Sequence, residues 1–140
     1  MFKLNADHFT SIVAHLIKEL PNEGCGILIG NFVGSYPYEL AETKVFFPTP
    51  NEKNSALAYQ IPAKSLLEAD RLAEKENLEI IGVVHSHTNS DPYPSSTDVQ
   101  NAFDPSWYYI IVSFRFEHPS LRAYRINNGI ISEEAVVVEK

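Results

Sequence analysis

Apolar residues recur at helical spacing in two segments of the chain. In the first segment they are Phe9, Ile12, Val13, Leu16, Ile17 and Leu20. They predict a helix that Asn5 or Asp7 can cap and that Pro21 ends. A second helix is predicted to begin near Pro62, and its apolar residues are Leu66, Leu67, Ala69, Leu72 and Ala73. Each stripe favours packing of the helix against a hydrophobic core.

Runs of β-branched and aromatic residues predict strands around these helices. The predicted strands are 26–32, about 36–47, 80–84, 107–114, 121–126 and 130–138. A turn around Gly34 and Ser35 should join the first two strands, and Asn127-Asn128-Gly129 is a hairpin signal between the last two. Helices and strands mix without an internal repeat, so we expect an α/β fold with a mixed, curved β-sheet flanked by helices.

Length and charge narrow the class of protein. A chain of 140 residues that is 44% hydrophobic can bury one core, so we expect a single domain over residues 1–140. The net charge of −7 and the absence of a Lys/Arg run argue against a nucleic-acid partner. No apolar stretch is long enough for a membrane span, and the N-terminus lacks the pattern of a signal peptide. These features predict a cytoplasmic protein without a membrane partner.

Cys25 is the only cysteine, so no intramolecular disulfide can form, which fits a reducing compartment. If Cys25 lies on a strand, it shares a face with Glu23, and its thiol could then lie near a metal site. The favoured interpretation is a small buried hydrophobic residue.

Two histidines follow directly on the apolar run 80–84, which has the composition of a buried strand. Side chains two positions apart on a strand point to the same face, so His85 and His87 can bind one ion while Ser86 points elsewhere. A short helix that Ser95 or Ser96 can cap is predicted to carry Asp98 in its first turn. Two imidazoles and a carboxylate are a ligand set of catalytic zinc. The isolated histidines are interpreted as hydrogen-bonded or exposed residues; they are His8, His15 and His118.

Three protein ligands leave one position of a tetrahedral zinc ion open for water. Zinc lowers the pKa of that water towards about 7. Peptide hydrolysis also needs a group that accepts the proton of the water and returns it to the leaving amine. We therefore expect a carboxylate near the metal.

These residues resemble the JAMM (MPN+) metalloprotease family, whose motif is an upstream Glu followed by His-Ser/Thr-His-x7-Ser-x2-Asp. The residues from His85 to Asp98 match the motif without a gap, and the matching upstream residue is Glu23. The resemblance implies that Glu23 is the general base and acid and that Ser95 helps to stabilise the oxyanion. It implies Zn2+ as the cofactor and an MPN/JAMM domain of cytidine deaminase-like fold.

The resemblance covers nearly the whole chain. Residues 45–51 and 59–62 resemble the family's strand, Asn-containing loop and second-helix start, and several runs are similar to the bacterial Mec-type branch; these runs are 85–88, 93–95, 97–99, 107–114, 121–126 and 133–134. Enzymes of that branch remove a cysteine from the C-terminus of a small sulfur-carrier protein of ubiquitin-like fold, a step in cysteine biosynthesis. The resemblance therefore implies a zinc metalloprotease that acts on the tail of such a carrier.

Three alternatives stay open. An isopeptidase that removes ubiquitin-like modifiers from lysines would need the same site. A non-catalytic MPN scaffold is disfavoured because all five functional positions are present. A RadC-like protein is disfavoured because the extra Gly and Pro spacing after its second His is not seen here. A homo-oligomer is compatible with the sequence.

The tail of a ubiquitin-like carrier is flexible and often ends in Gly-Gly. We expect it to add as a strand to an exposed sheet edge, which would bring its last carbonyl to the zinc. The loop 88–94, which Pro92 and Pro94 stiffen, should wall the channel, with Thr88 and Tyr93 as substrate-binding residues. The alternative is that this loop only connects two ligands.

Overall fold

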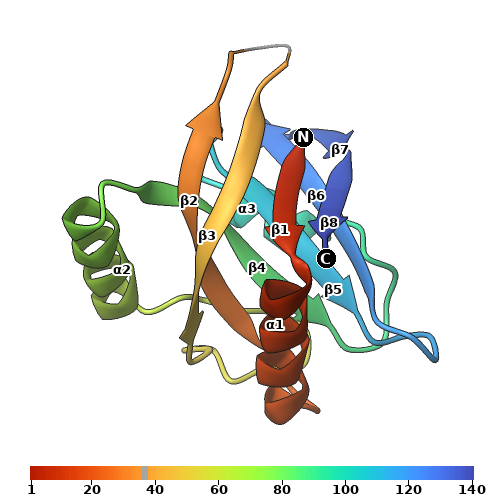
Figure 1. The fold of residues 1–140 in the computed structure, drawn as a ribbon. Coiled ribbons are helices and arrows are strands. Elements are labelled where there is room, and N and C mark those ends of the chain that lie inside the picture. The colour runs from red at the N-terminus through yellow and green to blue at the C-terminus, as the bar shows by residue number, and fades with distance from the viewer. Residues whose placement is uncertain (36–37) are drawn as a thin grey trace.

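The computed structural model describes residues 1–35 and 38–140, which form one mixed sheet and three helices (Figure 1). The strands are β1 (Phe2–Asn5), β2 (Cys25–Val33), β3 (Leu40–Thr49), β4 (Glu79–His87), β5 (Tyr108–Ser113), β6 (Ser120–Asn127), β7 (Ile130–Glu134) and β8 (Val136–Glu139). The helices are α1 (Ala6–Glu19), α2 (Ala63–Lys75) and α3 (Ser96–Asn101). The predicted α/β fold with a mixed sheet is confirmed.

The sheet is curved and nearly closed on itself. Its strand order is β7-β6-β5-β4-β2-β3-β1-β8, so β7 and β8 are its two edge strands. Only Ala135 separates these two strands in the sequence, and its carbonyl oxygen accepts a hydrogen bond from the Phe2 backbone (2.8 Å). Because one residue cannot span an open sheet of eight strands, the sheet must curl until its edges lie side by side.

Helices α1 and α2 cover opposite faces of the sheet, and Figure 1 shows them well apart. On β2, Leu28 packs in the same cluster as Ile12 and Leu16 of α1. Its neighbours Ile27 and Ile29 point to the other face and pack against α2. Successive side chains of β2 thus point to opposite faces of the sheet and contribute to both hydrophobic clusters.

The predicted helix starts and the last hairpin are confirmed. The side chain of Asn5 caps α1 by accepting a hydrogen bond from the His8 backbone (2.7 Å), and α2 begins directly after Pro62. At the hairpin, Asn128 and Gly129 have φ angles of 51° and 79°, as a two-residue β-turn of this kind requires. In the part of the chain that the structure describes, no helix is long and apolar enough to cross a membrane.

Three strand predictions need correction. The four residues of β1 were not predicted as a strand, because a run this short gives little periodic signal. The predicted strand 130–138 is two strands, since the chain passes at Ala135 from one sheet edge to the other. The strand predicted from about residue 36 begins at Leu40 in the described residues, and residues 36–37 lie outside them.

Candidate metal centre and catalytic site

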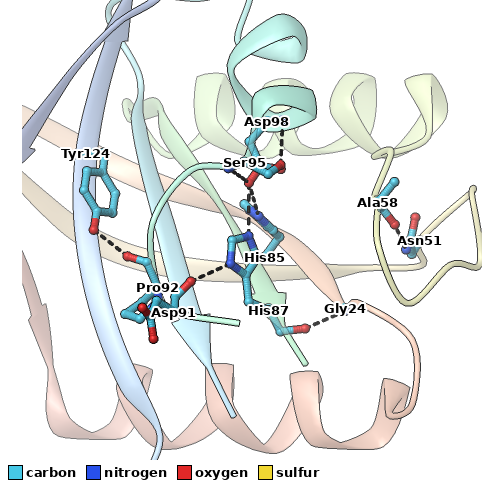
Figure 2. Close-up of polar contacts among 11 residues, drawn as sticks. Gly24, Asn51, Ala58, His85, His87, Asp91, Pro92, Ser95, Asp98 and Tyr124 are labelled. Carbon is cyan, nitrogen blue, oxygen red and sulfur yellow. Dashed lines mark hydrogen bonds and ion pairs between the residues drawn. The ribbon is translucent and has the colours of Figure 1, made fainter. Parts of the chain in front are cut away.

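The end of β4 brings two imidazoles to one face of the sheet. The Nε2 atoms of His85 and His87 lie 3.2 and 3.0 Å from Oδ2 of Asp98, and Figure 2 shows the three side chains converging. Ser86 points away from this cluster, and its Oγ accepts a hydrogen bond from the Gly24 backbone (2.8 Å). The predicted division of the three side chains between the two faces is confirmed.

Asp98 is fixed by the first turn of α3. Ser95 is the N-cap residue, and its Oγ accepts from the Asp98 backbone (3.1 Å). The Ser95 backbone in turn donates to Oδ2 of Asp98 (2.9 Å), which completes a capping box. The same carboxylate oxygen therefore holds the start of α3 and faces both histidines.

The hydrogen bonds of His87 select its tautomer. Its Nδ1 lies 2.8 Å from the carbonyl oxygen of Asp91. A carbonyl oxygen can only accept, so Nδ1 carries the proton and donates it. The Asp98 carboxylate also only accepts, so its hydrogen bond with Nε2 requires a second proton on the ring. Loss of that proton leaves a neutral ring with a lone pair on Nε2, which is the form that a metal ligand needs.

The three side chains fit a metal ion. One donor atom from each of His85, His87 and Asp98 lies within 4.8 Å of the other two. Burial lowers the pKa of His85, which favours the neutral, ligating ring. Burial disfavours the charge of Asp98, but hydrogen bonds with both histidines hold the pKa of its carboxyl group well below the usual range. Burial disfavours the charge of His87, but hydrogen bonds with Asp98 and the Asp91 backbone raise the pKa of this ring, so binding of a metal ion would release its proton. Two imidazole nitrogens and one carboxylate oxygen suit a divalent cation such as zinc.

Glu23 lies buried near these ligands, with 5% of its surface exposed. Its backbone N donates to the Ser55 carbonyl oxygen (2.8 Å), and Oε1 of its side chain has no hydrogen-bond partner among the described residues. Burial raises the pKa of Glu23 to about 7, while the charges of His87 and Asp98 lower and raise it, respectively. A carboxyl group that binds and releases a proton near neutral pH is therefore close to the candidate metal ligands.

The raised pKa of Glu23 has a consequence for stability. An unfolded Glu has a pKa near 4.5, so the folded state binds this proton more tightly, and stability falls as the pH rises from about 4.5 through 7. In chelator-treated protein at pH 8, Glu23→Gln should raise the free energy of unfolding by up to about 3 kcal/mol. At pH 4 the gain should vanish.

Urea unfolding of both proteins at the two pH values measures this difference. The exposed Glu117→Gln, outside the helices and strands, serves as the control and should show no gain at either pH. Equal stability of Glu23→Gln and wild type at pH 8 would contradict a raised pKa for Glu23.

Two residues at the site had no role assigned from the sequence. The ring of Tyr59 stacks on His85, with 4.2 Å between ring centroids and 18° between planes, and burial raises the pKa of Tyr59 well above its usual value. Asn51 donates from Nδ2 to the carbonyl oxygen of Glu23 (2.9 Å). Both residues are far from the ligands in the sequence, so the periodic pattern of side chains could not predict that they lie at the site.

The thiol of Cys25 is hydrogen-bonded and is not one of the converging candidate ligand atoms. Its Sγ lies 3.4 Å from both the Thr49 hydroxyl and the Pro50 carbonyl oxygen, and burial raises the pKa of this thiol to about 11. The interpretation of Cys25 as a small buried residue is confirmed. Nε2 of His15 lies 2.9 Å from the Cys25 carbonyl oxygen, so His15 is a hydrogen-bonded residue, as expected.

Hydrogen bonds from Ser113, from Tyr124 and to Ala56 hold the loop 88–94 in place. The Ser113 hydroxyl donates to the Ser90 carbonyl oxygen (2.5 Å), and the Tyr124 hydroxyl donates to that of Pro92 (Figure 2). Tyr93 is 56% exposed and lines a hollow of about 310 Å³. At the start of the loop, the Thr88 hydroxyl donates to the Ala56 carbonyl oxygen (3.5 Å).

A larger hollow of about 460 Å³ is lined in part by Tyr59, whose ring stacks on His85. Apolar side chains make up most of its wall, among them Ile61, Leu66, Phe103, Trp107 and Tyr109. Two separate hollows are thus lined by residues next to the candidate metal ligands, one by Asp91, Pro92 and Tyr93 of the loop 88–94 and one by Tyr59.

A curved α/β sheet that gathers two histidines, an aspartate and a buried glutamate in this way has the architecture of an MPN-type domain with a candidate metal site. The chain belongs to the family described as prokaryotic homologs of the JAB domain, whose model matches residues 5–127. The resemblance to the JAMM/MPN proteins is thereby confirmed.

The chain is similar to curated proteins that carry enzyme names, among them one from Mycobacterium tuberculosis and one from Thermus thermophilus. The chain is 34% identical over 139 residues to the CysO-cysteine peptidase of Mycobacterium tuberculosis, covering 98% of this chain and 91% of the relative. It is 32% identical over 126 residues to the probable TtuB-protein conjugate cleaving protease of Thermus thermophilus, covering 89% and 74%. Both names describe hydrolysis of a bond to a protein, so this chain is related to peptidases over nearly its full length.

The fold has a counterpart among solved structures. A JAB1/MPN domain protein from Archaeoglobus fulgidus matches with a TM-score of 0.60 at 19% identity, covering 99% of this chain and 98% of that chain. At this identity the likeness shows the fold alone.

Proposed function

We propose that the protein is a zinc-dependent metallopeptidase that hydrolyses the peptide bond at the C-terminal tail of a ubiquitin-like sulfur-carrier protein and releases a C-terminal cysteine. One observation carries the proposal: three convergent metal ligands lie near the buried carboxyl group of Glu23. The similarity of nearly the whole chain to a CysO-cysteine peptidase supports the choice of substrate.

His85, His87 and Asp98 would hold the zinc ion. Bound zinc supplies a Lewis acid that polarises the scissile carbonyl group and lowers the pKa of water. The protein contributes the burial of the ligands, with His85 and His87 only 2% and 4% exposed. Exclusion of bulk water strengthens every charge interaction within the site.

Glu23 would move the proton. With a pKa of about 7, a substantial fraction of its carboxyl groups is ionised at neutral pH and can accept a proton from the attacking water. The protonated carboxyl group can then donate that proton to the leaving amine nitrogen. A Glu with an ordinary pKa near 4.5 would accept this proton less readily, so burial of the carboxyl group matches its pKa to its task.

Ser95 would stabilise the developing oxyanion. Its Oγ already accepts a hydrogen bond from the Asp98 backbone, and this bond fixes the position of the hydroxyl group. The hydroxyl proton is not used in that bond, so it is available to donate to the substrate oxygen. Ser95 would thereby cap α3 and also stabilise the oxyanion.

The substrate tail would approach along the loop 88–94. Addition of the tail to a sheet edge next to the ligands is disfavoured, because β4 is paired on both sides and the sheet edges are β7 and β8. The loop remains a suitable wall, since its backbone is anchored at Ser90 and Pro92 while the ring of Tyr93 is exposed. Thr88 and Tyr93 are therefore proposed to contact the tail.

Cleavage of a carrier followed by intact mass tests the function. Zinc-loaded protein is incubated with small ubiquitin-like carriers that end in Gly-Gly-Cys, and the expected product is the carrier shortened by one cysteine. Chelator-treated protein is the control and should leave the substrate intact. If no carrier in such a panel is shortened, the proposed function is wrong.

A second candidate is an isopeptidase that cleaves ubiquitin-like modifiers from lysines. The relative from Thermus thermophilus, which is named as a conjugate cleaving protease, favours it. The same carrier joined through its terminal glycine to a lysine side chain provides the competing substrate. We expect a higher kcat/KM for the carrier ending in cysteine, and a preference for the lysine conjugate would replace the first candidate with the second.

Tyr93→Ala should weaken substrate use without affecting the metal. Loss of an aromatic contact with the tail is expected to lower kcat/KM by about tenfold, while the zinc content stays at the wild-type value. Replacing the penultimate glycine of the carrier with a bulky residue should have a similar effect. Tyr38→Ala is the control, since Tyr38 is 88% exposed and lines neither hollow. Unaltered cleavage after both changes would rule out threading of the tail along this loop.

A further inference from the structure

Asn51 is a buried amide that uses every one of its hydrogen-bonding groups. Its Nδ2 donates to the carbonyl oxygens of Glu23 (2.9 Å) and Ala58 (3.0 Å). Its Oδ1 accepts from the backbone N atoms of Lys53 (3.0 Å) and Gln60 (2.9 Å). One side chain thus closes the segment that follows it into a loop and ties that loop to the backbone of Glu23.

The loop that Asn51 closes carries an aromatic ring to the metal ligands. Ala58 and Gln60 are the immediate neighbours of Tyr59 in the sequence, and Asn51 binds both (Figure 2 shows the bond to Ala58). Tyr59 stacks on His85 with its ring centroid 4.2 Å away. Asn51 therefore holds the Glu23 backbone and also fixes the residues on each side of Tyr59, whose ring stacks on His85.

We propose that Asn51 is a positioning residue for catalysis: it couples the placement of the Glu23 carboxyl group to the stacking of Tyr59 on His85. This inference rests on the proposed peptidase function. Asn51 acts through Glu23 and Tyr59, because its four hydrogen bonds all go to backbone atoms of Glu23 and of the loop that carries Tyr59.

The chemistry of the position requires an amide. Asp has the same size and can accept from Lys53 and Gln60, but it cannot donate to the carbonyl oxygens of Glu23 and Ala58. Ala loses all four hydrogen bonds and leaves one buried and three partly buried backbone groups without these partners. Asn51→Asp and Asn51→Ala therefore remove two and four bonds from the same network.

Asn54 offers a matched control. It is exposed, and its Oδ1 accepts a hydrogen bond from Nδ2 of Asn22 (3.0 Å), so it links the same two segments at the surface. Its φ angle of 50° is one that glycine adopts without strain. Asn54→Gly therefore removes a link between the segments while the loop keeps its backbone conformation.

The experiment compares wild type, Asn51→Ala and Asn54→Gly in four measurements. Amide hydrogen exchange is followed at Lys53 and Gln60, and fluorescence is followed at Trp107, the single tryptophan, which lines the same hollow as Tyr59. Zinc content and the kinetics of carrier cleavage are measured alongside.

For Asn51→Ala we expect exchange at both amides to accelerate by about tenfold or more and the Trp107 emission to change. Zinc content should remain at the wild-type value. The kcat should fall by about tenfold or more while KM stays within about twofold, since the substrate contacts are intact and the placement of the proton acceptor is not. Asn54→Gly should match wild type in all four measurements.

A wild-type kcat in Asn51→Ala, or an equal loss in Asn54→Gly, would overturn the proposal. If Asn51→Ala does not fold, Asn51→Asp takes its place, and failure of both variants to fold would show that Asn51 serves the whole fold and not the site. If the wild-type protein cleaves no carrier, the proposed function fails. Exchange and fluorescence then still decide the coupling, which is wrong if neither changes in Asn51→Ala.

Discussion

Glu23→Gln is expected to keep its zinc and its fold and to lose peptidase activity by roughly 100-fold or more, the usual scale of general acid-base catalysis. Gln has nearly the size of Glu, so it fits the buried position, but its amide cannot accept a proton from water at neutral pH. Initial rates on a carrier ending in cysteine, together with metal analysis of the same preparation, measure both effects.

The control for this variant is Glu76→Gln, at an exposed position just after α2. It should cleave at the wild-type rate. Wild-type turnover in Glu23→Gln would remove Glu23 from the mechanism, and loss of zinc from this variant would show that the carboxylate belongs to the ligand set.

His85→Ala and His87→Ala are each expected to lower the zinc content from about one ion per chain to a small fraction of that value. Each change removes one of the three donor atoms that converge at the site, and the two that remain cannot hold the ion against dialysis. Metal analysis after purification without chelator, followed by dialysis, gives the zinc content directly.

His118→Ala is the matched control, because His118 is exposed and lies outside the cluster. It should keep its zinc. Wild-type protein that contains no metal after the same preparation would contradict the proposed cofactor, whatever the variants show.

Local chemistry explains why much of the site could be predicted from the sequence. The two-residue period of a strand places His85 and His87 on one face, and this depends on the backbone of β4 alone. The capping preference of Ser95 places Asp98 in the first turn of α3 in the same way. These rules act over a few residues, so they hold before the tertiary structure is known.

The features that were missed depend on contacts between distant segments. Tyr59 meets His85, and Asn51 meets Glu23, only because β2, β3 and β4 lie side by side in the folded sheet. The break at Ala135 is likewise set by the closure of the sheet, since residues 130–138 read as one continuous strand. Sequence periodicity describes a segment's own conformation and says nothing of which partners it meets.

The junction at Ala135 bears on how the chain folds as it is synthesised. β1 is synthesised before the other described strands, yet one of its two neighbours is β8, with Phe2 paired to Val136. Until that late segment has been made, β1 presents an unpaired backbone edge, which is a template for association with other chains. Because this pairing joins residues so far apart, we expect it to form late in folding. Its formation removes the exposed edge and joins the N-terminal and C-terminal segments in one cooperative unit.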